Sequence, residues 1–453
     1  MDNPVGSAHL ATLLRRLNWR LPRTATAPFC PSEVRGQVTV RATDPLTKKI
    51  TRFAGPGLLV AVGYMDPGNW ATDLQAGSAY GMSLLWIVVF AGLAAILLQG
   101  LSARVGVVTG RDLAELCRDR YSPMTSKLMF LAAELAVVAC DLAEVLGGAL
   151  AFNLLLGVSL ATGVALTALD TLLVLGLKGR GVRTLEAIVT ALVATIALCF
   201  AVELFIVRPD AHAIIAGVFP DPSSLKAPQA LYVAVGLIGA TIMPHNLYLH
   251  SSLVQTRRIV GPRDPSLSLK LAQVDLAMAL LAAMVINASI LILAAAAFHR
   301  PGLPVVATID GAWQLLKPIA GSAAAFLFAV ALLASGQSST FTGTIAGQVV
   351  LRGFIGDDRP CWQIRLATRT LALVPAMLGV IFLGNRGVGP LLVASQVLLG
   401  LQLPLALWPL IRISSDRKVM GAHVATSAVT AVAWTIFALV SVANVWLLLA
   451  LIL

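Results

Sequence analysis

The chain has 453 residues, of which 58% are hydrophobic and 12% charged, and its formal net charge is +11. Soluble globular proteins are roughly half apolar and a quarter charged, so this composition excludes that class and indicates a helical membrane protein. We attribute the positive charge to membrane topology rather than to nucleic-acid binding. The five cysteines form no close pair in the sequence, so we predict neither a zinc knuckle nor a disulfide framework.

Residues 1–53 are polar, contain arginine and proline, and lack the apolar core of a cleaved signal peptide. We predict that they form a largely disordered cytoplasmic tail and that residues 54–453 form the transmembrane domain. Within that domain, apolar segments of about 20 residues recur, which is the length that crosses a bilayer as a helix. We predict eleven spans, centred near Val60, Phe90, Val138, Leu166, Ala194, Gly239, Met284, Leu332, Met377, Leu401 and Leu439.

The positions of lysine and arginine test this span count, because short cytoplasmic loops hold most basic residues of a membrane protein. If the N-terminus lies inside, the cytoplasmic segments hold 28 of the 33 Lys and Arg residues. The opposite side holds only Arg208, Lys226, Arg300, Lys317 and Arg386. We therefore predict a multi-pass protein of the cell (inner) membrane with a cytoplasmic N-terminus and an external C-terminus.

Two short polar motifs, Asp66-Pro67-Gly68-Asn69 and Met243-Pro244-His245-Asn246, interrupt the first and sixth predicted spans. Proline lacks a backbone donor and glycine destabilises a helix, so both spans are predicted to break at mid-membrane depth. Lipid cannot satisfy the freed backbone groups. Such breaks therefore persist only around a cavity or a ligand.

The two broken spans lie five spans apart and enter the membrane from opposite sides. They occupy corresponding places in two inverted five-helix repeats, which is the arrangement of a secondary transporter with its site at the midplane. We predict repeat one over about residues 54–207, repeat two over about 228–412, and an eleventh helix over about 422–451.

The side chains at the breaks are suited to cation binding. Asp66 offers an anionic oxygen, Asn69 a neutral oxygen, and Met243 a polarizable sulfur that favours late divalent transition metals over Ca²⁺ or Mg²⁺. The amide of Gln396, in the tenth span, can complete an oxygen shell. His245 is suited either to accepting protons or to a buried structural hydrogen bond.

Glu134, Asp141 and Glu144 share one face of the third span, because their offsets of seven and three residues match the helical period. A carboxylate in the membrane costs about 3 kcal/mol on insertion scales, so this face must contact protein or water. An ion-pair network and a proton pathway are both compatible with this pattern. The candidate cationic partners are Arg257, Arg365 and Arg369.

An ordered series of motifs runs through residues 54–412. The most specific are Asp66-Pro67-Gly68-Asn69 and Ala240-Thr241-Ile242-Met243-Pro244-His245-Asn246, supported by Asp141-Leu142-Ala143-Glu144-Val145 and Ser395-Gln396-Val397. Through these motifs the chain resembles the Nramp family of proton-coupled divalent metal transporters. The resemblance implies an all-α polytopic protein with a LeuT-like fold, no enzymatic activity and no cofactor.

The resemblance also implies a metal site and a proton pathway. The implied metal ligands are Asp66, Asn69, Met243 and the backbone carbonyl of Ala240, joined in some conformational states by the Gly63 carbonyl and Gln396. The implied proton pathway consists of Asp66, His245, Glu134, Asp141, Glu144, Arg257 and Arg365. Many family members have two adjacent arginines where this chain has Ile364-Arg365, which puts the cytoplasmic exit of that pathway in question.

We expect a secondary transporter that imports Mn²⁺ or Fe²⁺, and also Cd²⁺ or Co²⁺, with proton co-transport by alternating access. Its partners would be the ion, protons and the lipid bilayer, with no nucleic acid and no obligate protein partner. Two alternatives remain open: a magnesium transporter of a related branch, and a sodium-coupled organic-solute carrier of the same fold. Met243 argues against both. A membrane sensor and an intramembrane metalloenzyme are also disfavoured, because the chain has neither a recognisable output domain nor a His-Glu-x-x-His motif.

Overall fold

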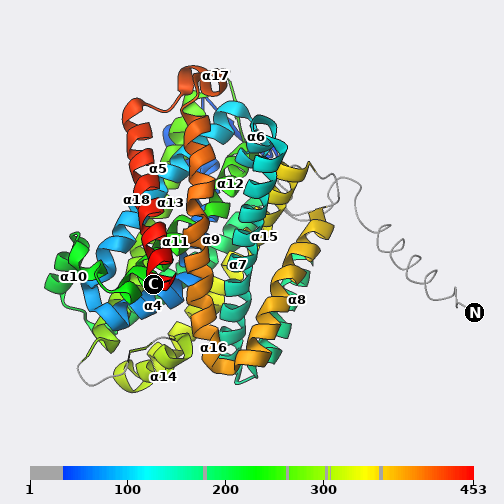
Figure 1. The fold of residues 1–453 in the computed structure, drawn as a ribbon. Helices are drawn as coiled ribbons and strands as arrows, with labels where there is room; N and C mark the ends of the chain where they lie inside the picture. The colour runs from blue at the N-terminus through cyan, green and yellow to red at the C-terminus, as the bar shows by residue number, and fades with distance from the viewer. Residues whose placement is uncertain are drawn as a thin grey trace, which may run out of the picture.

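The computed structural model describes residues 34–176, 181–261, 265–300, 305–306, 308–356 and 361–452. Most of its helices run parallel or antiparallel to one long axis (Figure 1). The helices are α2 (Leu46–Phe53), α3 (Pro56–Ala61), α4 (Pro67–Tyr80), α5 (Leu85–Thr109), α6 (Leu113–Arg120), α7 (Pro123–Leu156), α8 (Leu160–Gly176), α9 (Val182–Val207), α10 (Ala211–Val218), α11 (Pro228–Ile242), α12 (Pro244–Leu253), α13 (Ser266–Phe298), α14 (Ile309–Ala320), α15 (Ser322–Ile355), α16 (Cys361–Ser414), α17 (Arg417–Met420) and α18 (Ser427–Ile452).

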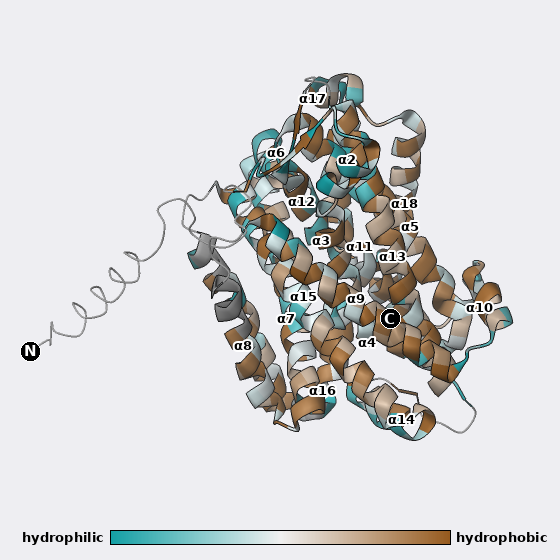
Figure 2. Ribbon diagram, turned by 180° about the vertical axis from the view of Figure 1, so that it is seen from behind, coloured by the Kyte–Doolittle hydropathy of each residue, from teal (hydrophilic) through white to brown (hydrophobic). Residues whose placement is uncertain are grey.

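Within the described residues, nine helical stretches are long and apolar enough to cross a membrane. The first, Pro67–Thr109, contains α4 and α5, which are separated by the short 3-10 helix Gly81–Leu84. Shorter apolar helices cover Pro56–Met65 and Leu160–Leu169. Every predicted span centre falls inside a helix, and the predicted all-α polytopic fold is confirmed. Figure 2 shows hydrophobic residues along the bundle and hydrophilic residues gathered at one end, around α2, α6 and α17.

The first predicted break lies between α3 and α4. The 3-10 helix η1 (Val62–Met65) follows α3, and Asp66 then adopts an extended backbone with φ −69° and ψ 164°. Pro67 occupies the first position of α4, where a backbone N–H would have no partner within the helix. The helix therefore restarts within the polar motif, as the sequence predicts.

The second break lies at Met243, between α11 and α12. Met243 has φ 44° and ψ 102°, a left-handed backbone that non-glycine residues rarely adopt. Pro244 begins α12 and cannot donate a backbone hydrogen bond into α11. Such a strained residue costs about 1–3 kcal/mol and persists where its surroundings hold it.

The predicted ninth and tenth spans lie within α16, as Leu366–Gly384 and Arg386–Ser414. The backbone leaves helical geometry at Gly384, with φ 60° and ψ −161°. Only glycine adopts this conformation readily, so Gly384 is where the chain turns from one span into the next.

Helix packing follows the symmetry that two inverted repeats predict. The first span (α4) packs against the seventh (α13), and the sixth (α11) packs against the second (α5). Exchanging the two repeats converts the first of these pairings into the second. The third span (α7) packs against α16, which holds the ninth and tenth spans, and the eighth (α15) packs against the fifth (α9). α18 lies outside this scheme and packs on α16 and α11.

Residues 38–53 are ordered, which differs from the largely disordered tail predicted over residues 1–53. The strand β1 (Val38–Arg41) pairs in parallel with β2 (Arg257–Val260), and α2 follows it. Val40 and Phe53 are buried in one apolar cluster. Local sequence could not predict this strand, because its partner belongs to the second repeat. Residues 1–33 lie outside the described residues.

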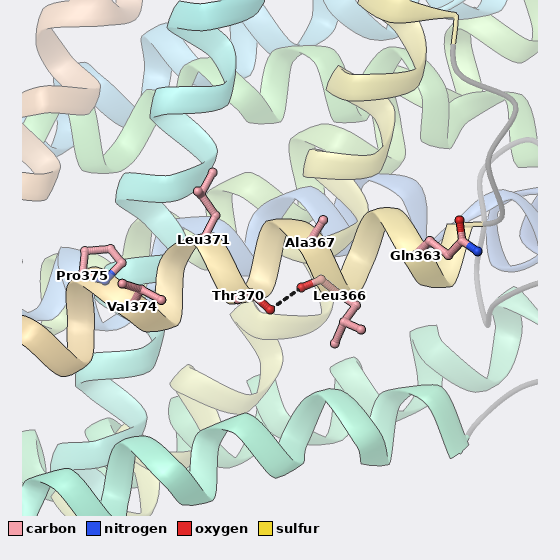
Figure 3. A pocket seen from close by; sticks show the side chains of 7 residues that line it. All are labelled: Gln363, Leu366, Ala367, Thr370, Leu371, Val374 and Pro375. Carbon is pink, nitrogen blue, oxygen red and sulfur yellow. Dashed lines mark hydrogen bonds between the residues drawn. The ribbon is translucent and has the colours of Figure 1, made fainter. Parts of the chain in front are cut away.

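A cavity of about 610 Å³ lies along the first half of α16 (Figure 3). Its lining is mostly apolar, and Leu366 and Leu371 are about half exposed. The hydroxyl of Thr370 donates to the carbonyl oxygen of Leu366 (2.8 Å), so this polar group is already satisfied. The cavity is suited to lipid chains rather than to an ion.

Candidate metal site at the two helix breaks

Asp66 is the N-cap of α4, and its side chain is fully buried. Its Oδ1 accepts one hydrogen bond from the backbone N–H of Asn69 (2.7 Å) and one from Asn69 Nδ2 (2.8 Å). Its Oδ2 lies 4.0 Å from Sγ of Cys140, a weak donor on α7. One carboxylate oxygen is thus held at the break, and the other faces the third span.

Three oxygens from the two breaks converge on the side-chain nitrogen of Asn69. Asn69 Nδ2 donates to the carbonyl oxygen of Gly63 (3.1 Å), to Asp66 Oδ1 (2.8 Å) and to the carbonyl oxygen of Ala240 (3.0 Å). An amide NH₂ group carries only two hydrogens, so the acceptors outnumber the donors here. An excess of oxygens directed at one point is the arrangement that a cation neutralises.

The thioether of Met243 lies against the first break. Met243 is fully buried, and its Sδ accepts a hydrogen bond from Asn246 Nδ2 (3.4 Å). A Cβ added to Gly63 would lie 2.9 Å from this sulfur and 2.3 Å from Asn246 Nδ2. The absence of a side chain at Gly63 therefore lets the two breaks approach each other. Asn246 belongs to the second polar motif, but no role was predicted for it.

Gln396 approaches the first break from α16. A Cβ added to Gly68 would lie 1.9 Å from Gln396 Nε2, so the amide packs directly on the backbone of the motif. Nε2 donates to the hydroxyl of Ser395 (2.9 Å), while the buried Oε1 has no hydrogen-bond partner among the described residues. A buried acceptor without a partner is costly, so this oxygen is a candidate ligand.

The structure thus brings together Asp66, Asn69, Gly63, Ala240, Met243 and Gln396, the six predicted ligands. In the part of the chain that the structure describes, no three His, Cys, Asp or Glu side chains cluster as metal ligands. The donor set at the breaks is one carboxylate with amides, carbonyls and a thioether. This mixture of hard oxygens and a soft sulfur fits a late divalent transition metal better than Ca²⁺ or Mg²⁺.

His245 lies in the first turn of α12, directly after the second break. Its side chain is buried, and Nδ1 has no hydrogen-bond partner within the described chain. A structural hydrogen bond at Nδ1 is therefore not present among the described residues. The ring nitrogen is available to accept a proton.

Asp141 and Glu144 form a buried ion-pair network with Arg369 of α16. Arg369 Nη1 lies 3.4 Å from Glu144 Oε2 and 4.0 Å from Asp141 Oδ1, and all three side chains are at most 2% exposed. Cys140 Sγ lies 3.8 Å from Glu144 Oε1 and 4.0 Å from Asp66 Oδ2. The thiol of Cys140 therefore connects the carboxylate at the break to the carboxylates of the third span, a link that sequence reasoning missed.

The remaining predicted proton-pathway residues lie elsewhere or are undescribed. Arg257 binds Glu186 (Nη2 to Oε1, 2.6 Å) and the carbonyl oxygen of Phe53 (Nε to O, 2.8 Å), at the end of the bundle that carries β1 and β2. Among the described side chains, Arg369 is the cation that contacts Asp141 and Glu144. Glu134 is partly buried, and its Oε2 has no hydrogen-bond partner among the described residues. The side chain of Arg365 lies outside the described structure.

Comparisons of sequence identify relatives over nearly the whole chain. The family model described as "Natural resistance-associated macrophage protein-like" (Nramp) matches residues 57–450. A "Divalent metal cation transporter MntH" of Ralstonia nicotianae is 58% identical over 430 residues, covering 94% of this chain and 97% of the relative. A "Divalent metal cation transporter MntH 1" of Pseudomonas aeruginosa is 56% identical, covering 95% of this chain and 99% of the relative.

Comparisons of structure agree with this assignment. A manganese transporter of Eremococcus coleocola superposes with a TM-score of 0.84 at 36% identity, covering 91% of this chain and 89% of the other. The nucleobase-cation-symport transporter Mhp1 superposes with a TM-score of 0.59 at 15% identity, covering 95% and 94%, and shows the shared fold alone. The chain therefore belongs to the Nramp family, whose members are membrane transporters rather than enzymes, and it has their LeuT-like fold.

Proposed function

We propose that this protein imports divalent transition metal ions, Mn²⁺ and Fe²⁺ and also Cd²⁺ and Co²⁺, together with protons by alternating access. The observation that carries the proposal is the convergence of oxygens from both helix breaks on the Asn69 amide, with the Met243 thioether beside them. The names of the Ralstonia and Pseudomonas relatives and of the Eremococcus structure point to the same substrate class.

The metal ion would replace the Asn69 NH₂ group at the point of convergence. A rotation of the Asn69 amide by half a turn would direct its Oδ1 at the ion. The ligands would then be oxygens of Asp66, Asn69 and the Ala240 carbonyl, and the sulfur of Met243. The Gly63 carbonyl and Gln396 would complete the shell in some conformational states. Asp66 supplies the only full negative charge among these ligands, so it determines most of the electrostatic attraction.

Protons would share Asp66 with the metal ion. A carboxylate cannot hold a proton and a divalent ion together, so metal binding releases the proton. Asp66 Oδ2 faces Cys140, and Cys140 faces Glu144, which gives the proton a direction toward the third span. In this proposal Glu144, Asp141 and Glu134 receive it in turn, and His245 accepts protons at the second break.

The distribution of Lys and Arg supports an orientation with the N-terminus in the cytoplasm and the C-terminus outside, in the inner membrane of the cell. Entry of a divalent ion then follows the negative-inside potential. Each elementary charge moved through 100 mV contributes about 2.3 kcal/mol, so the ion alone gains about twice that.

The test is Mn²⁺ uptake into proteoliposomes that contain an internal pH dye, with excess Ca²⁺ as competitor. Wild type should show saturable entry with acidification, Asp66→Ala should abolish it, and Met243→Ala should make it sensitive to Ca²⁺. Met278→Ala is the matched control, because Met278 is 56% exposed on α13. Failure of folded wild type to take up Mn²⁺, or Mg²⁺ uptake indifferent to Met243→Ala, would contradict the transition-metal proposal.

A further inference from the structure

A cavity of about 450 Å³ lies where the ends of several helices meet, away from the two breaks. The residues that line it include Arg120, Tyr121, Arg412, Ser415, Asp416 and Trp434. They come from the C-terminal end of α6, the C-terminal end of α16, the turn before α17, and α18. Figure 1 shows α6 and α17 together at one end of the bundle, where α16 and α18 also end.

The ends of three candidate spans place this cavity near the expected depth of lipid headgroups. The tenth span ends at Ser414, the eleventh begins at Ser427, and the third begins at Pro123, so three span ends surround it. The excess of Lys and Arg on this side indicates the cytoplasmic leaflet, which carries anionic lipids. Aromatic rings are gathered here as well. Tyr121 packs against Trp408 with ring centroids 5.1 Å apart.

The charges of the lining are only partly compensated. Arg120 donates to Asp416 Oδ2, and the other oxygen of Asp416 accepts from the Lys418 backbone N–H (2.8 Å). Arg412 is exposed, and its guanidinium has no ion-pair partner in the described part of the chain. The guanidinium of Arg412 is therefore available to bind an anion. That of Arg120 is paired with a carboxylate that a stronger anion can displace.

We propose that this cavity binds the phosphate headgroup of an anionic phospholipid of the cytoplasmic leaflet. The phosphodiester accepts charge-assisted hydrogen bonds from Arg412, and from Arg120 once Asp416 is displaced. Trp434 lies seven residues inside the start of α18, at the boundary between headgroups and acyl chains. A free phosphate ester offers the same charge, but it makes no use of this aromatic boundary. The lipid bridges α6, α16 and α18, so it ties the helix outside the repeats to the transport domain.

The experiment is native mass spectrometry of the full-length protein, purified in detergent and supplied with phosphatidylglycerol or phosphatidylcholine. Wild type should retain one phosphatidylglycerol in preference to phosphatidylcholine. Arg412→Gln should lower that retention about tenfold, which is the scale of one charge-assisted contact. Arg417→Gln is the matched control: it removes the same charge from adjacent α17, outside the cavity. Asp416→Asn should increase retention, because it releases Arg120.

Three results would overturn the proposal. Equal retention of the two lipids would show that the headgroup charge is not recognised. Equal loss in Arg412→Gln and Arg417→Gln would show a diffuse basic surface instead of this cavity. Displacement of the lipid by glycerol 3-phosphate at equal concentration would identify a site for a soluble phosphate ester. None of the variants touches the helix breaks, so failure of metal transport would be a separate result.

Discussion

Asn69 Nδ2 lies 3.0 Å from the carbonyl oxygen of Ala240, so a side chain at the first helix break is bound by the backbone of the second. The breaks belong to opposite repeats, and this contact joins the repeats at the point where the predicted ligands meet. The same amide turned over would present oxygen to a metal ion. Under the proposed function, the amide that joins the two breaks would therefore also be a ligand of the metal ion.

Asn69→Ala should weaken Mn²⁺ binding by at least about tenfold, because it removes one of the proposed ligands and leaves the surrounding oxygens without their donor. Isothermal titration of purified protein measures this directly. Asn444→Ala removes another buried amide, one on α18 that donates to the Gly400 carbonyl (2.9 Å) and is not a proposed ligand, and should leave Mn²⁺ affinity unchanged. Equal affinities of wild type and Asn69→Ala would remove Asn69 from the ligand set.

Gly68→Ala should abolish Mn²⁺ uptake, because the new methyl group would lie 1.9 Å from Gln396 Nε2 and force apart Gln396 and the backbone that carries Asp66 and Asn69. The double variant Gly68→Ala/Gln396→Ala relieves the clash and should recover part of the uptake. Gly100→Ala on α5 has its nearest atom at 3.8 Å and is the control for added helix propensity. If the double variant is no more active than Gly68→Ala, the clash with Gln396 is not the cause of the lost uptake.

Arg369→Gln should destabilise the protein by about 3–5 kcal/mol, because it leaves Asp141 and Glu144 buried without their cation. Adding Glu144→Gln removes one of the two unpaired buried charges and should recover part of the lost stability. Thermal unfolding in detergent gives both values. If Arg369→Gln is as stable as wild type, Asp141 and Glu144 are already neutral in the folded protein.

Much of the architecture could be predicted from local sequence, because long apolar segments, prolines and loop charges are local signals. The meeting of the two breaks could be predicted for the same reason, since Asp66 and Met243 stand inside the two helix-breaking motifs. Spacing along one helix shows which side chains share a face, but it does not show which helix covers that face. Arg257, Arg365 and Arg369 were therefore all candidate partners of the third-span acids. The structure pairs Arg257 with Glu186 and places Arg369 against Asp141 and Glu144.

Val40→Asp should detach β1 from the bundle, because Val40 is fully buried with Phe53 and Val254. An unpaired buried charge costs about 3 kcal/mol or more. Thr39→Asp adds the same charge one residue earlier, on the exposed side of the strand, and should be tolerated. Limited proteolysis of the N-terminal segment distinguishes them: rapid cleavage is expected for Val40→Asp alone, and equal cleavage rates would contradict the buried position of β1.

Asp112→Asn tests a buried carboxyl outside the spans. Asp112 is the N-cap of α6 and accepts from the Glu115 backbone N–H (2.8 Å). Burial, with a smaller effect from the Glu115 charge, raises the pKa of Asp112 to about 7.

The unfolded chain has its Asp pKa near 4, so the folded state holds this proton more tightly. The contribution of Asp112 to stability is therefore greatest below about pH 4 and is lost as the pH rises toward about 7. Asparagine keeps an acceptor and cannot ionise. The melting temperature of Asp112→Asn minus that of wild type should thus be larger at pH 8 than at pH 5.

The pH dependence expected for Asp119 has the opposite sign, because a hydrogen bond from Arg111 lowers the pKa of Asp119. Asp119→Asn should lose stability relative to wild type at neutral pH, and this difference should shrink as the pH falls through the pKa. A pH-independent difference for Asp112→Asn would show that the carboxyl is solvated in the folded protein.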